Sequence, residues 1–276
     1  MSSQLLMTYQ HKGLTLPYLD SGAGIPVILL HGFPEDAHSW HRVIPHLTAA
    51  GLRVIVPEMR GYAATANPRD KAAYSLAQLM GDIIALLDHL QLDRAHLVGH
   101  DLGGLLAWEL AMRYPLRFQT LTALGTPHPQ AMVWSYGHSG QLFKSAYIGG
   151  FQVPWIPENL VARILPATLK RAGLNATDTA ALATRFATPA SLTGPLNWYR
   201  GLFVNAPVPP ADALVRVPTT YVWGNHDPFL GRAAAVKTQT FVAADYRFLV
   251  LNAGHWLPEQ RPLATAQAII NRTQSH

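Results

Sequence analysis

A chain of 276 residues with 49% hydrophobic and 13% charged side chains can bury a large core, which favours a globular enzyme. The formal net charge is +5, but the 21 lysine and arginine residues are spread along the chain and do not indicate nucleic-acid binding. The chain has no cysteine, which excludes disulfides, thiol nucleophiles and zinc–thiolate sites.

The N-terminal part predicts an antiparallel hairpin, residues 5–10 and 14–20, followed by short apolar runs that alternate with helical patterns. Such alternation is typical of a parallel sheet whose strands are joined by crossover helices. The clearest helix covers residues 76–90, with Ser75 and Gln78 as a predicted capping box at its start. The predicted buried strands are residues 27–30, 54–56, 96–98, 120–124, 221–223 and 248–251.

The pentapeptide Gly99-His100-Asp101-Leu102-Gly103 lies where the strand at 96–98 meets an amphipathic helix predicted for residues 102–113. A glycine on either side of the central residue permits a strained strand-to-helix turn that exposes this side chain at the edge of the sheet. The better-known turn has serine at its centre, whereas this chain has Asp101. A carboxylate attacks carbon without losing a proton first, and the product is an ester. The motif therefore predicts the opening of an epoxide or the expulsion of a halide rather than acyl transfer.

The alternation of strands and helices stops near residue 127 and resumes near residue 217. The intervening sequence has prolines, helical patterns and many aromatic residues, but no strand pattern. We therefore expect a core domain of residues 1–126 and 211–276 and a helical cap of residues 127–210. Four aromatic residues of the insertion are candidates to line an apolar substrate pocket: Trp134, Phe151, Trp155 and Trp198.

Two candidate partners of Asp101 follow the last predicted strands, Asp227 after residues 221–223 and His255 after residues 248–251. The chain order nucleophile, acid, histidine is characteristic of α/β-hydrolases. With a carboxylate nucleophile, we expect His255 to activate the water that hydrolyses the ester, and Asp227 to hold the tautomer of His255.

An oxyanion hole is predicted where the first parallel strand ends, at His31-Gly32-Phe33-Pro34-Glu35. The expected donors are the backbone N–H groups of Phe33 and of Leu102, the residue after the nucleophile. They would bind the carbonyl oxygen of the ester as it becomes tetrahedral.

Several motifs together resemble the epoxide hydrolases of the α/β-hydrolase fold superfamily. The similarity extends from about residue 12 to residue 265 and implies a mostly parallel eight-stranded sheet flanked by helices, with an inserted, mainly helical cap. The motifs are the His31–Glu35 segment, Met59-Arg60-Gly61-Tyr62, the turn around Asp101, Gly125-Thr126-Pro127-His128-Pro129 and Gly254-His255-Trp256.

Two segments of the insertion make the resemblance more specific. Tyr147 stands four residues before a Phe-Gln pair, and Tyr199 follows Asn-Trp, as do the two cap tyrosines of the family. The resemblance implies that both phenols hydrogen-bond the epoxide oxygen and donate a proton as the ring opens. A phenol with a pKa of about 10 suits this step, because the departing alkoxide is strongly basic. We therefore expect an epoxide hydrolase that forms a hydroxyalkyl ester on Asp101 and releases a vicinal diol.

Other functions of this fold stay open at this point. A haloalkane dehalogenase shares the aspartate nucleophile but has tryptophan after it and usually asparagine after the His-Gly pair, where this chain has Leu102 and Phe33. A fluoroacetate dehalogenase, another enzyme with an aspartate nucleophile, needs arginines just after that residue, where this chain has Leu102 and Leu105. A serine-type esterase is disfavoured by Asp101 itself. A catalytically silent, ligand-binding member would be expected to lack a catalytic residue, and none is missing here.

The expected partner is a small apolar epoxide, with no nucleic acid, no cofactor and no metal. The first seven residues lack the features of a signal peptide, and no apolar run approaches the roughly 18 residues that span a membrane. We therefore expect a cytoplasmic protein without a membrane span. The sequence leaves a homodimer open and does not identify the epoxide.

Overall fold

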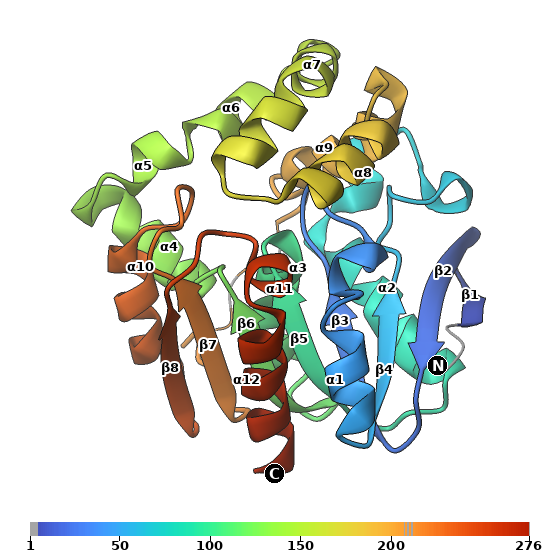
Figure 1. Ribbon diagram of the computed structural model, residues 1–276, viewed down its shortest axis with the longest axis vertical. Coiled ribbons are helices and arrows are strands. Elements are labelled where there is room, and N and C mark those ends of the chain that lie inside the picture. Colours follow the sequence, from blue (N-terminus) through green and yellow to red (C-terminus); the bar gives the residue numbers. More distant parts are fainter. Residues whose placement is uncertain (1–4, 207, 209, 211, 276) are drawn as a thin grey trace.

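An eight-stranded sheet forms the centre of the molecule (Figure 1). The computed structural model describes residues 5–206, 208, 210 and 212–275. β2 pairs antiparallel with both β1 and β4, and all the other neighbouring strands are parallel. Across the sheet the order is β1-β2-β4-β3-β5-β6-β7-β8. The strands are β1 (Leu5–His11), β2 (Leu14–Ser21), β3 (Ile25–Leu30), β4 (Leu52–Pro57), β5 (Ala95–His100), β6 (Phe118–Leu124), β7 (Thr219–Gly224) and β8 (Tyr246–Leu251).

The predicted hairpin is present as β1–β2, and the six predicted strands are present as β3–β8. The prediction that residues 248–251 are buried is wrong, because no residue of β8 is buried. Every residue of β5 and of β7 is buried, as expected for central parallel strands that are covered on both faces. β8 instead alternates between half-buried and exposed side chains, because it lies at the edge of the sheet.

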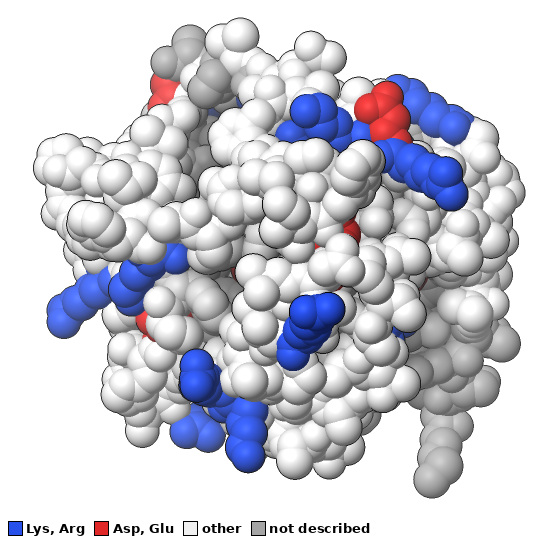
Figure 2. All heavy atoms as spheres, turned by 90° about the horizontal axis from the view of Figure 1, so that it is seen from above, with Lys and Arg blue, Asp and Glu red and all other residues white. Residues whose placement is uncertain are grey.

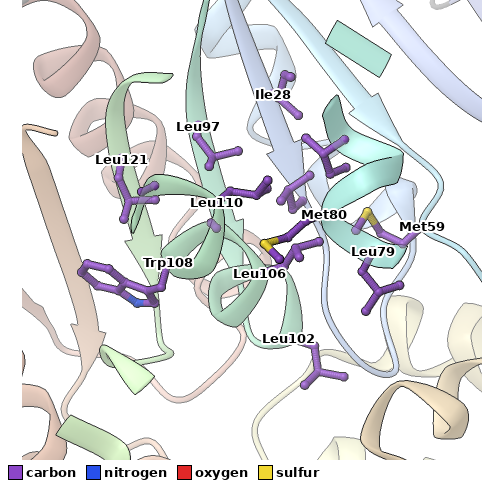
Figure 3. Close-up of a cluster of buried hydrophobic side chains, with 14 of the residues drawn as sticks. Ile28, Met59, Leu79, Met80, Leu97, Leu102, Leu106, Trp108, Leu110 and Leu121 are labelled. Atoms are coloured by element: carbon purple, nitrogen blue, oxygen red, sulfur yellow. The ribbon is translucent and has the colours of Figure 1, made fainter. Parts of the chain in front are cut away.

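Helices cover both faces of the sheet. α2 (Leu76–His89) and α3 (Leu102–Arg113) pack on one face, and α1 (Ile44–Ala49) and α12 (Pro262–Gln274) pack on the other. Within β3, Ile28 belongs to the first apolar cluster and Val27 to the second, because successive side chains of a strand point to opposite faces. Figure 3 shows Leu110 of α3 near Leu97 of β5, and Leu106 of α3 near Met80 of α2, all within the first cluster.

The predicted capping box at the start of α2 is wrong. Ser75 is the N-cap residue, but its side chain makes no capping hydrogen bond. Ser75 also ends the preceding 3-10 helix, and its backbone N–H donates to the carbonyl of Ala72. The side chain of Gln78 instead accepts a hydrogen bond from Nζ of Lys12 at 3.0 Å. Gln78 thus binds the turn between β1 and β2 rather than the start of its own helix.

The segment between β6 and β7 contains no strand among its described residues, and its helices are called the inserted helices below. α5–α9 lie over the carboxyl ends of the parallel strands (Figure 1), and α7 packs on α8 and α9. Residue 211, at the predicted boundary, lies outside the described residues, and the division into core and cap domains stays a prediction. The inserted helices are α4 (Pro129–His138), α5 (Gln141–Lys144), α6 (Ala146–Phe151), α7 (Ile156–Arg171), α8 (Ala176–Arg185) and α9 (Pro189–Gly201).

Lysine and arginine lie in separate groups on the face that bears the inserted helices, and uncharged atoms cover most of that face (Figure 2). In the described parts of the chain, we find no helix with the length and apolar character that crossing a bilayer requires.

The remaining helices are α10 (Arg232–Lys237) and α11 (Leu257–Gln260), and the 3-10 helices are η1 (Ala37–Trp40), η2 (Ala64–Ala66), η3 (Lys71–Tyr74) and η4 (Thr238–Phe241).

Candidate active site

Asp101 occupies the sharp turn between β5 and α3. Its backbone has φ = 52° and ψ = −121°, a conformation that a residue with a side chain rarely adopts and that costs about 1–3 kcal/mol. The two glycines around it permit close contacts within the turn. A Cβ on Gly99 would lie 2.2 Å from the carbonyl oxygen of Gly103, and a Cβ on Gly103 would lie 2.5 Å from that of Leu30. The predicted strand-to-helix turn is therefore present, with Asp101 at its centre.

The two carboxylate oxygens of Asp101 have different partners. Oδ1 accepts a hydrogen bond from the backbone N–H of Phe33 at 2.9 Å, and Oδ2 lies 3.2 Å from Nε2 of His255. Leu102 is the first residue of α3, where a backbone N–H has no acceptor within the helix. Phe33 thus occupies the position expected of an oxyanion donor, and the same role for Leu102 stays a prediction.

His255 lies between two carboxylates. Its Nδ1 is 2.8 Å from Oδ2 of Asp227, and the other oxygen of Asp227 accepts the backbone N–H groups of Phe229 and Leu230 at 2.8 and 2.9 Å. Asp227 follows β7 and His255 follows β8, so the parallel strands bring both residues to the edge of the sheet where Asp101 lies. The structure brings the three predicted residues together in the predicted order.

The charges of this cluster stabilise the ionised forms of its members. Burial alone lowers the pKa of His255, but Asp227 and Asp101 outweigh burial and raise this pKa well above its usual value. Burial tends to raise the pKa of Asp101, but the hydrogen bond and charge of His255 lower it overall. Asp101 is therefore an ionised carboxylate at neutral pH, as a nucleophile requires.

Tyr147 of α6 and Tyr199 of α9 line the same cavity as Asp101 and His255. Their rings are 6.2 Å apart in an edge-to-face arrangement. Burial raises the pKa of both phenols above the usual value, and the negative charge of Asp101 adds to this effect. Both side chains consequently stay protonated at neutral pH and can donate hydrogen bonds into the cavity.

The cavity has a volume of about 530 Å³ and mostly aromatic and aliphatic walls. Phe151 lines it, as predicted, but the three predicted tryptophans are not among its lining residues. Trp198 is buried and donates its indole N–H to the carbonyl of Arg60, so it anchors α9 to the core. Trp155 is 80% exposed, and Trp134 stacks on His138.

A family model described as alpha/beta hydrolase fold matches residues 25–262 of this sequence. The chain belongs to this family. Among its relatives, the AB hydrolase superfamily protein YfhM of Bacillus subtilis is 34% identical over 94% of both chains. The human protein named epoxide hydrolase 4 is 33% identical, over 91% of this chain and 73% of its own length. The crystal structure of epoxide hydrolase A from Mycobacterium thermoresistibile superposes with a TM-score of 0.84 at 25% identity, covering 99% of this chain and 98% of that one. This α/β-hydrolase is thus a relative of the epoxide hydrolases.

A buried polar network behind the site of this α/β-hydrolase was not predicted from sequence. One oxygen of Glu35 accepts hydrogen bonds from the backbone N–H of Gly32 at 3.0 Å and from Nδ1 of His100 at 2.8 Å. Nε2 of His100 lies 2.9 Å from the carbonyl oxygen of His255. Both partners of His100 are acceptors, so each ring nitrogen donates when both bonds form. The network joins the loop that carries Phe33 to the loop that carries His255.

Glu259 is a second buried carboxyl group near this network. Burial and the neighbouring Glu35 together raise its pKa well above the usual value. Burial also acts to raise the pKa of Glu35, but the interaction with His100 outweighs it and lowers this pKa. Glu259 is therefore protonated while Glu35 is ionised. Glu35 is part of the motif His31–Glu35 that the sequence analysis singled out, whereas nothing in the sequence linked Glu35 to Glu259.

Among the described residues, no group of histidine, aspartate or glutamate side chains is arranged to hold a metal ion.

Proposed function

We propose that this protein hydrolyses epoxides to vicinal diols through a covalent ester on Asp101. The observation that carries the proposal is an ionised carboxylate that shares one cavity with two protonated phenols. Ring opening of an epoxide needs these two functions at once, a nucleophile at carbon and a proton donor at oxygen. The names of the relatives in the α/β-hydrolase family support the same reaction.

In the first step, Oδ2 of Asp101 attacks one epoxide carbon and the C–O bond of the ring breaks. The attacking atom is Oδ2 because Oδ1 is held by the N–H of Phe33 and becomes the carbonyl oxygen of the ester. The departing oxygen takes a proton from Tyr147 or Tyr199 and becomes a hydroxyl group. The products of this step are a hydroxyalkyl ester and a phenolate.

In the second step, Nε2 of His255 takes a proton from water, and the resulting hydroxide attacks Cγ of Asp101. The negative charge of the tetrahedral intermediate develops on Oδ1, where the N–H groups of Phe33 and Leu102 stabilise it. Collapse expels the diol as an alkoxide, which takes the proton from His255. The proton released when the Asp101 carboxyl group ionises restores the phenol. Asp227 steadies the imidazolium ion throughout.

A dehalogenase is the nearest competitor, because it also begins with attack by a carboxylate. Halide needs donors that stay protonated without giving the proton away, and Leu102 and Phe33 have no side-chain N–H to supply. The phenols instead match an oxygen leaving group that must be protonated. Release of halide from chloroalkanes or bromoalkanes in the absence of epoxide hydrolysis would favour the competitor.

The proposal is tested by a single turnover of styrene oxide in heavy-oxygen water. The label is expected in the carboxyl group of Asp101, located by peptide mass spectrometry, and not in the diol. Label that appears only in the diol contradicts the covalent step. With His255→Gln the ester is expected to accumulate, visible as a mass increase equal to that of the substrate, while Asp101→Ala serves as the control that cannot form it.

A further inference from the structure

The cavity at Asp101 extends far beyond the reacting groups, along one side of α7. Eight residues of this helix line it in two rows, each with a spacing of four residues. The rows span three helical turns, about 18 Å along the helix axis. The outer row is Ile156, Leu160, Ile164 and Thr168, and the inner row is Pro157, Val161, Leu165 and Leu169.

The two rows differ in what covers them. Val161, Leu165 and Leu169 of the inner row are buried in an apolar cluster with Trp256, so packing within the protein accounts for them. In the outer row, Ile156, Leu160 and Ile164 are 66%, 53% and 45% exposed. A regular row of exposed aliphatic side chains that faces a cavity is typical of a ligand-binding groove.

Along α7, the described residues that line the groove carry no charged side chain. Asp101 and His255 carry the charges among its lining residues, and neither lysine nor arginine is among them. Thr168 does not add a free donor, because its hydroxyl donates to the carbonyl of Ile164 at 3.0 Å. A chain lying in this groove therefore meets aliphatic groups along three turns of α7.

We infer that this groove binds an extended, uncharged alkyl chain attached to the epoxide. The preferred substrates are then long aliphatic epoxides rather than small or anionic ones. The inference rests on the proposed function and adds the substrate class, because the groove is continuous with the cavity that holds Asp101 and the two tyrosines. Elongation along a single helix favours a linear chain over a compact ring system.

The first test compares terminal epoxides derived from propene, hexene, decene and tetradecene, with diol formation as the readout. Burial of each methylene is worth about 0.8 kcal/mol, so kcat/KM is expected to rise about fourfold per added methylene until the groove is full. A decene-derived epoxide with a carboxylate at its far end is expected to be a poorer substrate than the uncharged one. Equal kcat/KM values across the series, or a preference for the carboxylate, overturn the inference.

A pair of variants on α7 tests where the chain lies. Ile164→Glu places a charge in the groove and is expected to lower the ratio of kcat/KM for the decene epoxide to that for the propene epoxide by about tenfold or more. Ala167→Glu adds the same charge at an exposed position of the same helix that does not line the cavity, and is expected to leave this ratio unchanged. The same fall in both variants, or in neither, contradicts the assignment.

The series also separates the two proposals. If no epoxide yields a diol, the proposed function fails. If propene oxide and styrene oxide are hydrolysed but chain length and Ile164→Glu have no effect, only the substrate class fails.

Discussion

The backbone N–H of Phe33 lies 2.9 Å from Oδ1 of Asp101, and the residue before Phe33 makes this approach possible. A Cβ on Gly32 would lie 2.3 Å from Cβ and 2.6 Å from Oδ1 of Asp101. Glycine at this position therefore lets the end of β3 and the turn after β5 come together. One backbone contact thus places the proposed oxyanion donor next to the proposed nucleophile.

Gly32→Ala is accordingly expected to displace Asp101 or to break its hydrogen bond with Phe33. We predict a loss of kcat/KM of about 100-fold or more, the size typical for loss of one oxyanion donor. Circular dichroism should show that the fold is retained.

Gly137→Ala is the control, because a Cβ at this position within α4 would meet nothing within 4 Å. It is expected to keep full activity and to stabilise the protein slightly. Wild-type activity in Gly32→Ala would contradict the placement of the nucleophile.

Removing the hydroxyl groups of the two tyrosines should slow ring opening specifically. Tyr147→Phe and Tyr199→Phe are each expected to lower the rate of ester formation by about 10- to 100-fold, and the double variant should nearly stop it. The rate is measured by rapid quenching and mass analysis of the ester. Because the second step uses His255, hydrolysis of an ester once formed should change much less. A double variant that forms the ester at the wild-type rate would remove the phenols from the mechanism.

The pH dependence of the second step follows from the neighbours of His255. His255 must be unprotonated to activate water, and its pKa in the free enzyme is raised by Asp227 and Asp101. Asp101 becomes a neutral ester after the first step, so one of the raising influences is lost while Asp227 remains. The rate of ester hydrolysis should therefore fall on the acidic side with an apparent pKa below the pKa of His255 in the free enzyme. The pKa of His255 in the free enzyme is measured by NMR titration. Coincident values would show that Asp101 has little influence on His255.

The sequence predicted which residues meet at the candidate site better than it predicted the walls of the cavity. Asp101, Asp227 and His255 each follow a strand of one parallel sheet, and the end of a strand determines where the next side chain lies. The cavity wall could not be inferred in this way, because Val161, Leu165 and Leu169 have the spacing of any helix that packs on a core. The pattern identifies the apolar face of α7, but not whether protein or ligand covers it. Three tryptophans of the insertion were predicted to line the pocket because they are aromatic, yet Trp198 packs between α9 and the core instead.

Glu35 and Glu259 also escaped sequence-based prediction, because they are far apart in the chain and meet only in the folded protein. Their opposite pKa shifts predict opposite effects of the same substitution. The pKa of Glu259 in the folded protein is raised above the usual value of about 4.5, which it has in the unfolded chain. Above about pH 4.5, ionisation of Glu259 therefore increasingly favours the unfolded state. Glu35 has a lowered folded pKa, so its ionised form stabilises the folded state at neutral pH, and this contribution is lost as the pH falls through the folded value.

Glu259→Gln mimics the protonated carboxyl group and should therefore stabilise the protein at pH 7, raising Tm by about 2 °C or more, the shift that roughly 1 kcal/mol produces at this size. The gain should vanish near pH 4, where wild-type Glu259 is protonated in both states.

Glu35→Gln is the matched counterpart. It leaves the buried ring of His100 without its carboxylate partner, and should lower Tm at pH 7 by more than it does near pH 4. Thermal unfolding of wild type and both variants at the two pH values measures these differences. Shifts of the same sign in both variants, or differences independent of pH, would contradict the assignment of a protonated Glu259 beside an ionised Glu35.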